Sequence, residues 1–508
     1  MNYLEIDGNS LTCEDIKAVA CKEIPVRLTA QARKNVELCR AYVEEIISEG
    51  KTVYGLTTGF GKFSNVKISP KHLDELQENL IKSHAINVGQ PYSKEQTRAI
   101  MLLRANVLAK GYSGIKLETL QTLLELLNKK VHPVIPRKGS VGASGDLSPL
   151  SHLALVLIGR GKAEFNEQII SGAEALAKAG IKPVTLSAKE GLALNNGTQV
   201  MTAIGVLTLL EAEELAKSAD IIAAMTVDAL LGTPAAFDPL IHKLRPHQGQ
   251  SASAANLKAL LKHSPLRASH INCDQVQDPY SLRCTPQVHG AVRDALAYVR
   301  KTLATEINSA TDNPLIFPKE KKVISGGNFH GEPLAIALDT LAIAVSELGS
   351  ISERRIEQML NPALNRGLPP FLASRPGLDS GFMITQLTAA AAVSENKVLA
   401  HPASVDSIPT SANQEDHVSM GSISANKALE VVENVNTVLA IELMIALQAL
   451  DYRKLPSSPA LEAVRKQLRK IVKPLHHDRE MSADLNQLKS YLKEHSLADI
   501  VSDYVHIK

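Results

Sequence analysis

The chain has 508 residues, of which 44% are hydrophobic and 21% charged, and its formal net charge is +2. This composition is ordinary for a soluble globular protein, and the length is sufficient for two or more subregions. Because the charge is spread without a basic block or an acidic tail, the composition argues against nucleic acid or a membrane surface as a partner.

Helical patterns dominate the chain. Three helices with recognisable caps or stop residues are predicted first, from Thr29 to Gly50, from Ser69-Pro70 to near Gly89, and from the Ser93/Gln96 capping box to Gly111. Segments rich in Ala, Leu, Ile and Glu predict five longer helices, over 198–231, 287–310, 333–361, 381–400 and 424–450. Since helices that are apolar on most sides are buried, we expect these five in a large bundle or against neighbouring subunits. Short strands are predicted near 2–6 and 162–170.

Six polar segments lie between the predicted helices, and binding and catalytic residues concentrate on such loops. They cover residues 54–61, 140–149, 194–198, 272–287, 324–333 and 402–420. The stretch between Glu190 and Glu211 is uncharged, but its amides and threonines favour a loop entering a buried helix over a membrane span.

One of these loops contains the small residues Ala143-Ser144-Gly145. The amide nitrogen of Gly145 can attack the carbonyl carbon of Ala143 and close a five-membered ring. Loss of water, and then of the Ser144 hydroxyl as a second water, leaves a methylidene-imidazolone, an electrophile that no ordinary side chain supplies. A side chain at position 145 would crowd the ring, and the strained closure needs enforcement by surrounding structure. Taken alone, the tripeptide favours an ordinary turn.

The residues after the tripeptide predict where it lies. Ser148-Pro149 has the pattern of a helix N-cap followed by proline at the first helical position. The tripeptide is therefore expected just before a helix N-terminus, where the positive end of the helix dipole favours developing negative charge.

The cysteines, the first residues and one histidine pair indicate the compartment and the absence of a metal site. The cysteines are too few and too irregular for a disulfide or zinc framework, at Cys13, Cys21, Cys39, Cys273 and Cys284. No basic segment leads into an apolar run at the start, so no signal peptide is expected, and a reducing cytoplasm fits best. The adjacent His476 and His477 point apart on any regular element and are expected at the surface, without a metal.

Four long motifs together resemble the histidine ammonia-lyase family, within the wider aromatic amino acid lyases. They are GSVGASGDLSPL at 139–150, QDPYSLRCTPQ at 277–287, ISGGNFH at 324–330 and SANQEDHVSM at 411–420. The resemblance runs from about Tyr54 to about Met420 and continues more weakly to the C-terminus. It implies a mainly α fold, with a smaller N-terminal globular region over 1–110 and an extended bundle of long helices over 111–508. It also implies a homotetramer whose active sites draw loops from three subunits.

The resemblance implies catalytic roles for residues around the electrophile formed by Ala143, Ser144 and Gly145. Tyr54 corresponds to the general base that removes the β-proton, and since a phenol has a pKa near ~10, nearby positive potential would be needed to hold it as phenolate. Asn196 corresponds to the donor to the ring's carbonyl oxygen. Tyr280 contacts the substrate or the electrophile, and Phe329 packs beside it. The residue-level alternative for Tyr54 is a packed tyrosine in a glycine-rich turn.

Four further residues correspond to substrate-binding positions. Arg283 clamps the substrate carboxylate through a two-pronged guanidinium contact, and Gln277 orients the site. His84 and Glu415 recognise an imidazole, which needs hydrogen-bond partners where a phenyl ring needs apolar surface. Phenylalanine and tyrosine lyases carry Phe-Leu or His-Leu where this chain has Ser83-His84.

The sequence departs from its relatives at two places. Asn195 stands where an aliphatic residue is common, so the role of the family's asparagine is assigned to Asn196 by its position before Gly197. Ile86-Asn87 replaces the small residues that relatives often carry.

The implied function is non-oxidative elimination of ammonia from L-histidine to give trans-urocanate, the first step of histidine degradation. The implied cofactor is the internally formed 4-methylidene-imidazol-5-one, with no external cofactor. A phenylalanine or tyrosine lyase, or an aminomutase, would share the electrophile. A catalytically inactive helical scaffold is the alternative from a different class.

Overall fold

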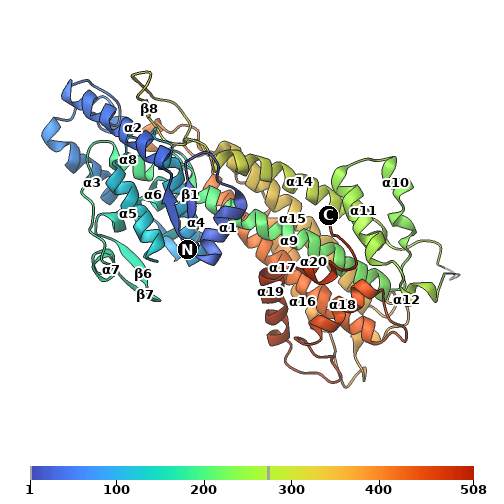
Figure 1. Ribbon diagram of the computed structural model, residues 1–508. Coiled ribbons are helices and arrows are strands. Elements are labelled where there is room, and N and C mark those ends of the chain that lie inside the picture. The colour runs from blue at the N-terminus through green and yellow to red at the C-terminus, as the bar shows by residue number, and fades with distance from the viewer. Residues whose placement is uncertain (1–2, 272–274) are drawn as a thin grey trace. The chain divides into compact units, whose positions relative to one another are not determined.

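The computed structural model describes residues 3–271 and 275–508 of the chain. α-Helices predominate among them, and the strands are few and short (Figure 1), so the predicted mainly α class is confirmed. The chain divides into two compact units. Unit 1 comprises Met1–Leu207, Arg300–Asp339 and Pro402–Asn426, and unit 2 comprises Thr208–Val299, Thr340–His401 and Lys427–Lys508. The expected domain boundary near residue 110 stays a prediction.

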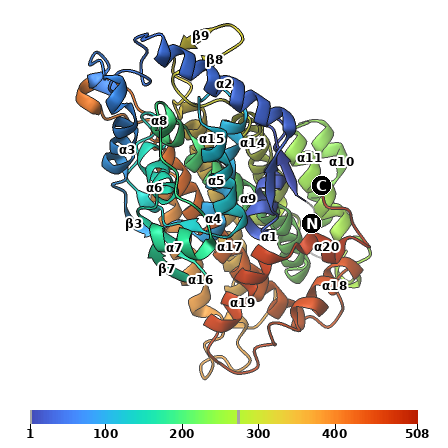
Figure 2. The same cartoon turned by 60° about the vertical axis from the view of Figure 1, so that its left-hand side comes forward.

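Eight of the described α-helices are confined to unit 1, and most of them pack in two groups. The eight helices are α1 (Cys13–Lys22), α2 (Ala30–Ser48), α3 (Leu73–His84), α4 (Lys94–Ala109), α5 (Leu117–Asn128), α6 (Leu147–Leu157), α7 (Gly172–Ala179) and α8 (Glu190–Asn195). Helix α4 is buried along nearly its whole length and packs against α1, α2 and α5 (Figure 2). Helices α3, α6 and α8 pack on one another, which brings His84 and two of the predicted functional loops, 140–149 and 194–198, to one part of the unit.

The strands of unit 1 pair in small sheets. β1 (Leu4–Ile6) runs parallel to β2 (Val26–Leu28), and β3 (Val88–Pro91) is antiparallel to β5 (Pro136–Lys138). β4 (His132–Pro133), β6 (Lys162–Phe165) and β7 (Gln168–Ser171) follow the order β4-β6-β7, and β8 (Leu315–Phe317) is antiparallel to β9 (Lys322–Ile324). The strand predicted near 162–170 is thus two strands, because Asn166 and Glu167 have positive φ and reverse the chain.

Four long helices have residues in both units, namely α9 (Gln199–Ala229), α14 (Thr285–Glu306), α15 (Glu332–Leu360) and α17 (Gly421–Asp451). The shorter helices of unit 2 are α10 (Pro239–Lys243), α11 (Gln248–Leu260), α12 (Pro265–Ala268), α13 (Tyr280–Arg283), α16 (Met383–Leu399), α18 (Pro459–Leu468), α19 (Ser482–Glu494) and α20 (Leu497–Val501). All five predicted long helices, α16 included, are confirmed to within about one turn.

Buried polar contacts join the long helices inside unit 2. The Arg355 guanidinium donates to both carboxylate oxygens of Glu442, at 2.5 and 2.8 Å, and the Thr226 hydroxyl donates to the same carboxylate at 2.8 Å. These contacts join α9, α15 and α17. Helix α15 is long and apolar enough to cross a membrane, but 61% of its most apolar window is buried inside the protein, as in the core helix of a soluble protein.

Several predicted helix ends are confirmed and others are wrong. The Thr29 side chain caps α2 by accepting from the Ala32 amide, and the Ser93/Gln96 capping box opens α4. Helix α3 follows a single 3-10 turn that begins at Pro70, but it ends at His84 and not near Gly89. The reason is long-range, since the residues around Gly89 pair with β5 instead.

The start of α6 also differs from the prediction. The helix begins at Leu147 with Asp146 at the cap position, so Ser148 is not the N-cap. The Ser148 hydroxyl instead accepts from the Ile86 amide at 3.2 Å. The tripeptide still lies directly before a helix N-terminus, as expected. The loop predicted at 194–198 is shorter, because α8 continues to Asn195.

Candidate active site

The ends of three packed helices place the central residues of the candidate site in unit 1. Helix α3 ends at His84, α6 begins directly after the tripeptide, and α8 ends just before Asn196. The Asp146 amide donates to the Gly197 carbonyl oxygen at 2.7 Å, which ties the segment after the tripeptide to the segment after α8. The sequence predicted these loops separately, and the helix packing brings them together.

Gly145 fits its position because it has no side chain. Its φ is +70°, and a Cβ atom there would lie 2.2 Å from the carbonyl oxygen of Gly197. Any other residue would therefore force the two segments apart. The requirement for glycine at 145 thus has a packing cause in addition to the steric demand of ring closure.

Asp146 anchors the tripeptide from its C-terminal side. Its carboxylate accepts from the backbone amides of Val200 and Met201, both at 2.9 Å, and from the Ser422 hydroxyl at 2.7 Å. Burial raises the pKa of Asp146 to about 6 in spite of these donors. Asp146 was not among the residues predicted from the sequence, although it lies directly after Gly145.

Asn196 faces the backbone of the tripeptide. Its Nδ2 donates to the Ser144 carbonyl oxygen at 3.4 Å, and this oxygen is the one that the proposed ring would keep as its carbonyl. The fully buried Arg104 holds Asn196 in place, because its guanidinium donates to the Asn196 carbonyl oxygen at 2.8 Å and to Gln199 Oε1 at 2.6 Å. Nothing in the sequence pattern of α4 marked Arg104 for this position.

The two departures from the family pattern have structural contacts. The buried Asn195 donates through Nδ2 to the Ser151 hydroxyl at 3.1 Å, away from the tripeptide, so the assignment to Asn196 agrees with the geometry. The buried Asn87 donates to the Pro136 carbonyl oxygen at 2.8 Å and fixes the segment after α3 on β5, while Ile86 is exposed.

Ser144 and Glu415, which are 271 positions apart, form a direct contact. The Ser144 hydroxyl donates to Glu415 Oε1 at 2.9 Å, and Glu415 Oε2 accepts from Thr410 and Ser411 at 2.7 and 2.9 Å. His84 lies within electrostatic range of Glu415. Burial lowers the pKa of His84, while the Glu415 carboxylate opposes this shift. Of the two predicted imidazole-binding residues, Glu415 thus contacts the tripeptide directly, and His84 lies within electrostatic range of Glu415.

Tyr54 and Phe329 also lie in unit 1, on other loops. The Tyr54 hydroxyl accepts from the Gly61 amide at 3.2 Å, within the glycine-rich turn. Tyr54 also lines a cavity of about 370 Å³, together with Tyr42 and Val53. Phe329 is half-buried in the loop before α15. Among the described residues, no hydrogen bond joins Tyr54 or Phe329 to the tripeptide.

Gln277, Tyr280 and Arg283 belong to unit 2. Tyr280 and Arg283 lie on the single turn of α13, and the Arg283 guanidinium carbon is 4.7 Å from the centre of the Tyr280 ring. Tyr280 is 70% exposed, and Gln277 is exposed as well. Arg283 Nε is buried and makes no hydrogen bond within the described residues, which leaves a donor available. Residues 272–274 of the same loop, Cys273 among them, lie outside the described residues.

Sequence comparison identifies relatives along the whole chain. The profile of the aromatic amino acid lyases matches residues 11–470. A histidine ammonia-lyase of Caldanaerobacter subterraneus is 54% identical over 506 residues, covering 99% of both chains. A histidine ammonia-lyase of Koribacter versatilis is 52% identical over 511 residues, covering 98% of this chain and 99% of the relative.

Solved structures give the same result. A histidine ammonia-lyase from Trypanosoma cruzi superimposes with a TM-score of 0.92 at 46% identity, over 99% of this chain and 96% of that one. A tyrosine aminomutase from Streptomyces globisporus superimposes with a TM-score of 0.94 at 38% identity, over the full length of both chains. Since the predicted resemblance is confirmed and the matches extend beyond it over nearly the whole chain, this chain belongs to the aromatic amino acid lyase family.

Proposed function

We propose that this protein eliminates ammonia from L-histidine without oxidation and releases trans-urocanate, a carbon–nitrogen lyase reaction that opens histidine degradation. Its similarity to histidine ammonia-lyases, at 52–54% identity over nearly the whole chain, supports the reaction class. The observation that carries the substrate assignment is the contact of Glu415 with Ser144, with His84 beside it.

The cofactor in this proposal is a 4-methylidene-imidazol-5-one made from Ala143, Ser144 and Gly145. The residues present fit this group. Gly145 has no Cβ to obstruct closure, and Asn196 Nδ2 already donates to the oxygen that would become the ring carbonyl. Once formed, the group supplies an electrophile for the substrate amine, which makes ammonia a better leaving group.

The remaining residues bind the substrate and move its proton. Arg283 binds the carboxylate with its guanidinium, and Gln277 orients the loop that carries it. Tyr54 removes the β-proton as general base, with the Gly61 amide donating to its oxygen. Tyr280 and Phe329 enclose the reacting atoms and exclude water.

His84 and Glu415 recognise the imidazole ring of the substrate. Burial lowers the pKa of His84, which favours the neutral ring at pH 7. Because its Nδ1 lies 3.0 Å from the Ser83 hydroxyl, Nε2 is the nitrogen that faces the substrate in this proposal. The Glu415 carboxylate accepts from the imidazole N–H. A phenyl ring would leave His84 Nε2 and, once the Ser144 hydroxyl is lost, Glu415 Oε1 without a partner in a partly buried site, which disfavours phenylalanine and tyrosine.

The substrate assignment predicts a change of selectivity in one variant. His84→Leu is expected to lower kcat/KM for histidine about 100-fold, because the imidazole loses a buried hydrogen-bond partner, and to lower it far less for phenylalanine. Ammonia release from histidine, phenylalanine and tyrosine, measured separately with both proteins, checks this. Faster turnover of a phenyl substrate by the unaltered protein would contradict the assignment, and a β-amino acid product would indicate an aminomutase.

Self-association into a homotetramer completes the proposal. Helix α16 is apolar but largely exposed, with Ile384 at 60%, Leu387 at 58% and Val398 at 75%. At about 100° per residue these three positions fall on one side of the helix, and exposed apolar side chains on one helix side are typical of an interface. In this proposal the loop of Tyr280 and Arg283 reaches the site of a neighbouring subunit. A reducing cytoplasm as the proposed location agrees with Cys39 and Cys284, which form no disulfide within the described residues.

Leu387→Glu is expected to reduce the number of chains per particle, because it places a charge in the middle of that apolar face. Light scattering of the purified protein measures the mass. Lys397→Glu, on the same helix, is the matched control for an added charge. A tetrameric mass for Leu387→Glu, or a monomeric mass for the unaltered protein, would contradict the proposed assembly.

A further inference from the structure

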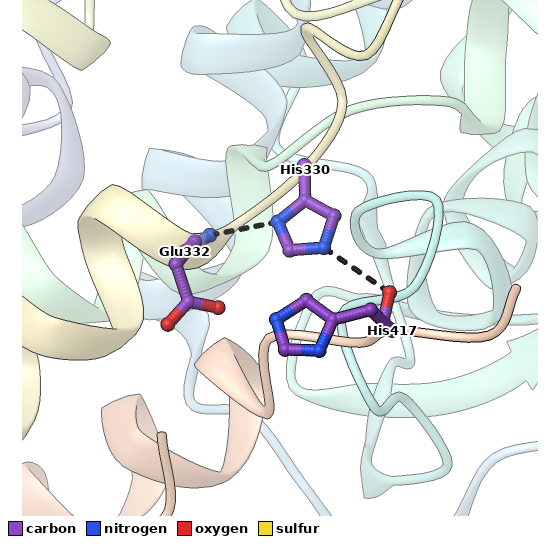
Figure 3. A group of neighbouring side chains, drawn as sticks. All are labelled: His330, Glu332 and His417. Atoms are coloured by element: carbon purple, nitrogen blue, oxygen red, sulfur yellow. Dashed lines mark hydrogen bonds between the residues drawn. The ribbon is translucent and has the colours of Figure 1, made fainter. Parts of the chain in front are cut away.

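Three side chains that no step of the proposed reaction uses converge beside the candidate site. His330 and Glu332 lie at the start of α15, and His417 lies in the loop that carries Glu415. Their ligand atoms all lie within 4.8 Å of one another. Figure 3 shows the carboxylate of Glu332 and the ring of His417 approaching the ring of His330 from the same side.

Backbone contacts orient the His330 ring. Its Nε2 lies 3.2 Å from the His417 carbonyl oxygen, which makes Nε2 the protonated, donating nitrogen. His330 Nδ1 accepts a long hydrogen bond from the Glu332 amide at 3.4 Å, and a cation bound at Nδ1 would replace this bond. A histidine whose second nitrogen donates to a backbone carbonyl has the orientation typical of a metal ligand.

Glu332 supplies the observation that points to a cation. Its Oε2 is buried and has no hydrogen-bond partner within the described residues. A buried carboxylate oxygen without a donor is costly, and a bound cation would satisfy it. The rings of His330 and His417 are parallel to within 2°, with their centres 5.7 Å apart.

We propose that His330, Glu332 and His417 bind a divalent transition metal of the Zn²⁺ class. Two imidazoles and one carboxylate match the ligand preference of Zn²⁺, and three protein ligands leave a fourth position open to water. Two ligand atoms bound at about 2.1 Å cannot be more than about 4.2 Å apart, so the site closes by a small rotation of the exposed His417.

A metal at this site would join two segments that are far apart in the sequence. His330 directly follows Phe329, and His417 lies two residues after Glu415. The ion would therefore fix the position of two candidate site residues relative to each other. Its binding is measurable without turnover, so the inference can fail while the proposed reaction stands, and the reverse also holds.

The test is a calorimetric titration of the full-length, chelator-treated protein with ZnCl2. We expect one Zn²⁺ per chain in the unaltered protein, and at least about 10-fold weaker binding in His417→Asn. The matched control is His72→Asn, which disrupts an exposed pair with Glu75 at 3.0 Å that has only two ligands. It is expected to bind Zn²⁺ as the unaltered protein does.

Two further measurements keep the inference falsifiable if a variant misfolds. Co²⁺ in the unaltered protein should give visible absorption bands of low-symmetry nitrogen and oxygen coordination, and His417→Asn should lose them. Glu332→Gln, which keeps the shape and removes the charge, should weaken Zn²⁺ binding at unchanged circular dichroism. Equal Zn²⁺ affinity in His417→Asn and the unaltered protein, or no stoichiometric binding at all, would overturn the proposal.

Discussion

Ser144→Ala is expected to lower kcat for ammonia release from histidine at least about 1,000-fold, which corresponds to about 4 kcal/mol of lost transition-state stabilisation. The hydroxyl of Ser144 is the group that leaves as the second water, and alanine has none to lose. The variant therefore cannot form the methylidene carbon that the substrate amine attacks. Because Glu415 is the one partner of the Ser144 hydroxyl within residues 3–271 and 275–508, the fold should survive the change.

Intact mass spectrometry measures maturation independently of turnover. The unaltered protein should be lighter than its sequence by two waters, and Ser144→Ala by no more than one. Ser148→Ala is the matched control, since Ser148 also bonds through its hydroxyl but lies outside the tripeptide. It should mature fully. An unmodified mass together with no lyase activity in the unaltered protein would favour the inactive helical scaffold.

Tyr54→Phe is expected to lower kcat about 100- to 10,000-fold, the range that a positioned general base contributes. The phenol oxygen is the atom that receives the β-proton, and phenylalanine keeps the ring but lacks that atom. Stopped assays of urocanate formation measure the loss. Intact mass should still show two waters missing, because Tyr54 takes no part in closing the ring.

Tyr42→Phe is the matched control for the loss of a phenol, because Tyr42 lines the same cavity as Tyr54 but is buried in the core around α2. Its kcat should stay within a few-fold of that of the unaltered protein. A similar loss in both variants would mean that the packing of this cavity, and not proton transfer by Tyr54, determines the rate.

Local sequence signals predicted the fold well where the determining contacts are local. Thr29 and Ser93 cap their helices by accepting from amides only three residues away. The cap and the start of the helix can therefore both be predicted from one short stretch of sequence. The prediction of helix ends failed where a contact with a residue distant in the sequence determines the end. Ser148 bonds to the Ile86 amide instead of capping α6, and the residues after His84 pair with β5 instead of continuing α3.

In the candidate site too, local sequence patterns identified residues but could not predict the long-range contacts between them. The motifs named the residues, but their spacing could not show that Glu415 accepts from Ser144, because the contact spans 271 positions and depends on tertiary packing. The buried Arg104 stood in an ordinary helical pattern and could not be selected at all. Asp146 and the group of His330, Glu332 and His417 lay inside or beside the quoted motifs, and only the three-dimensional arrangement distinguishes them from their neighbours.

The contacts of Asp146 determine the stage of synthesis and folding at which the electrophile can form. Its carboxylate is held by amides at 200 and 201 and by the hydroxyl of Ser422, so the strained turn before it is complete only after synthesis has passed residue 422. A nascent or unfolded chain would thus carry three unreactive residues. The reactive group would form only in molecules that have folded correctly. Cellular amines and thiols would therefore find no electrophile to react with in an unfolded chain.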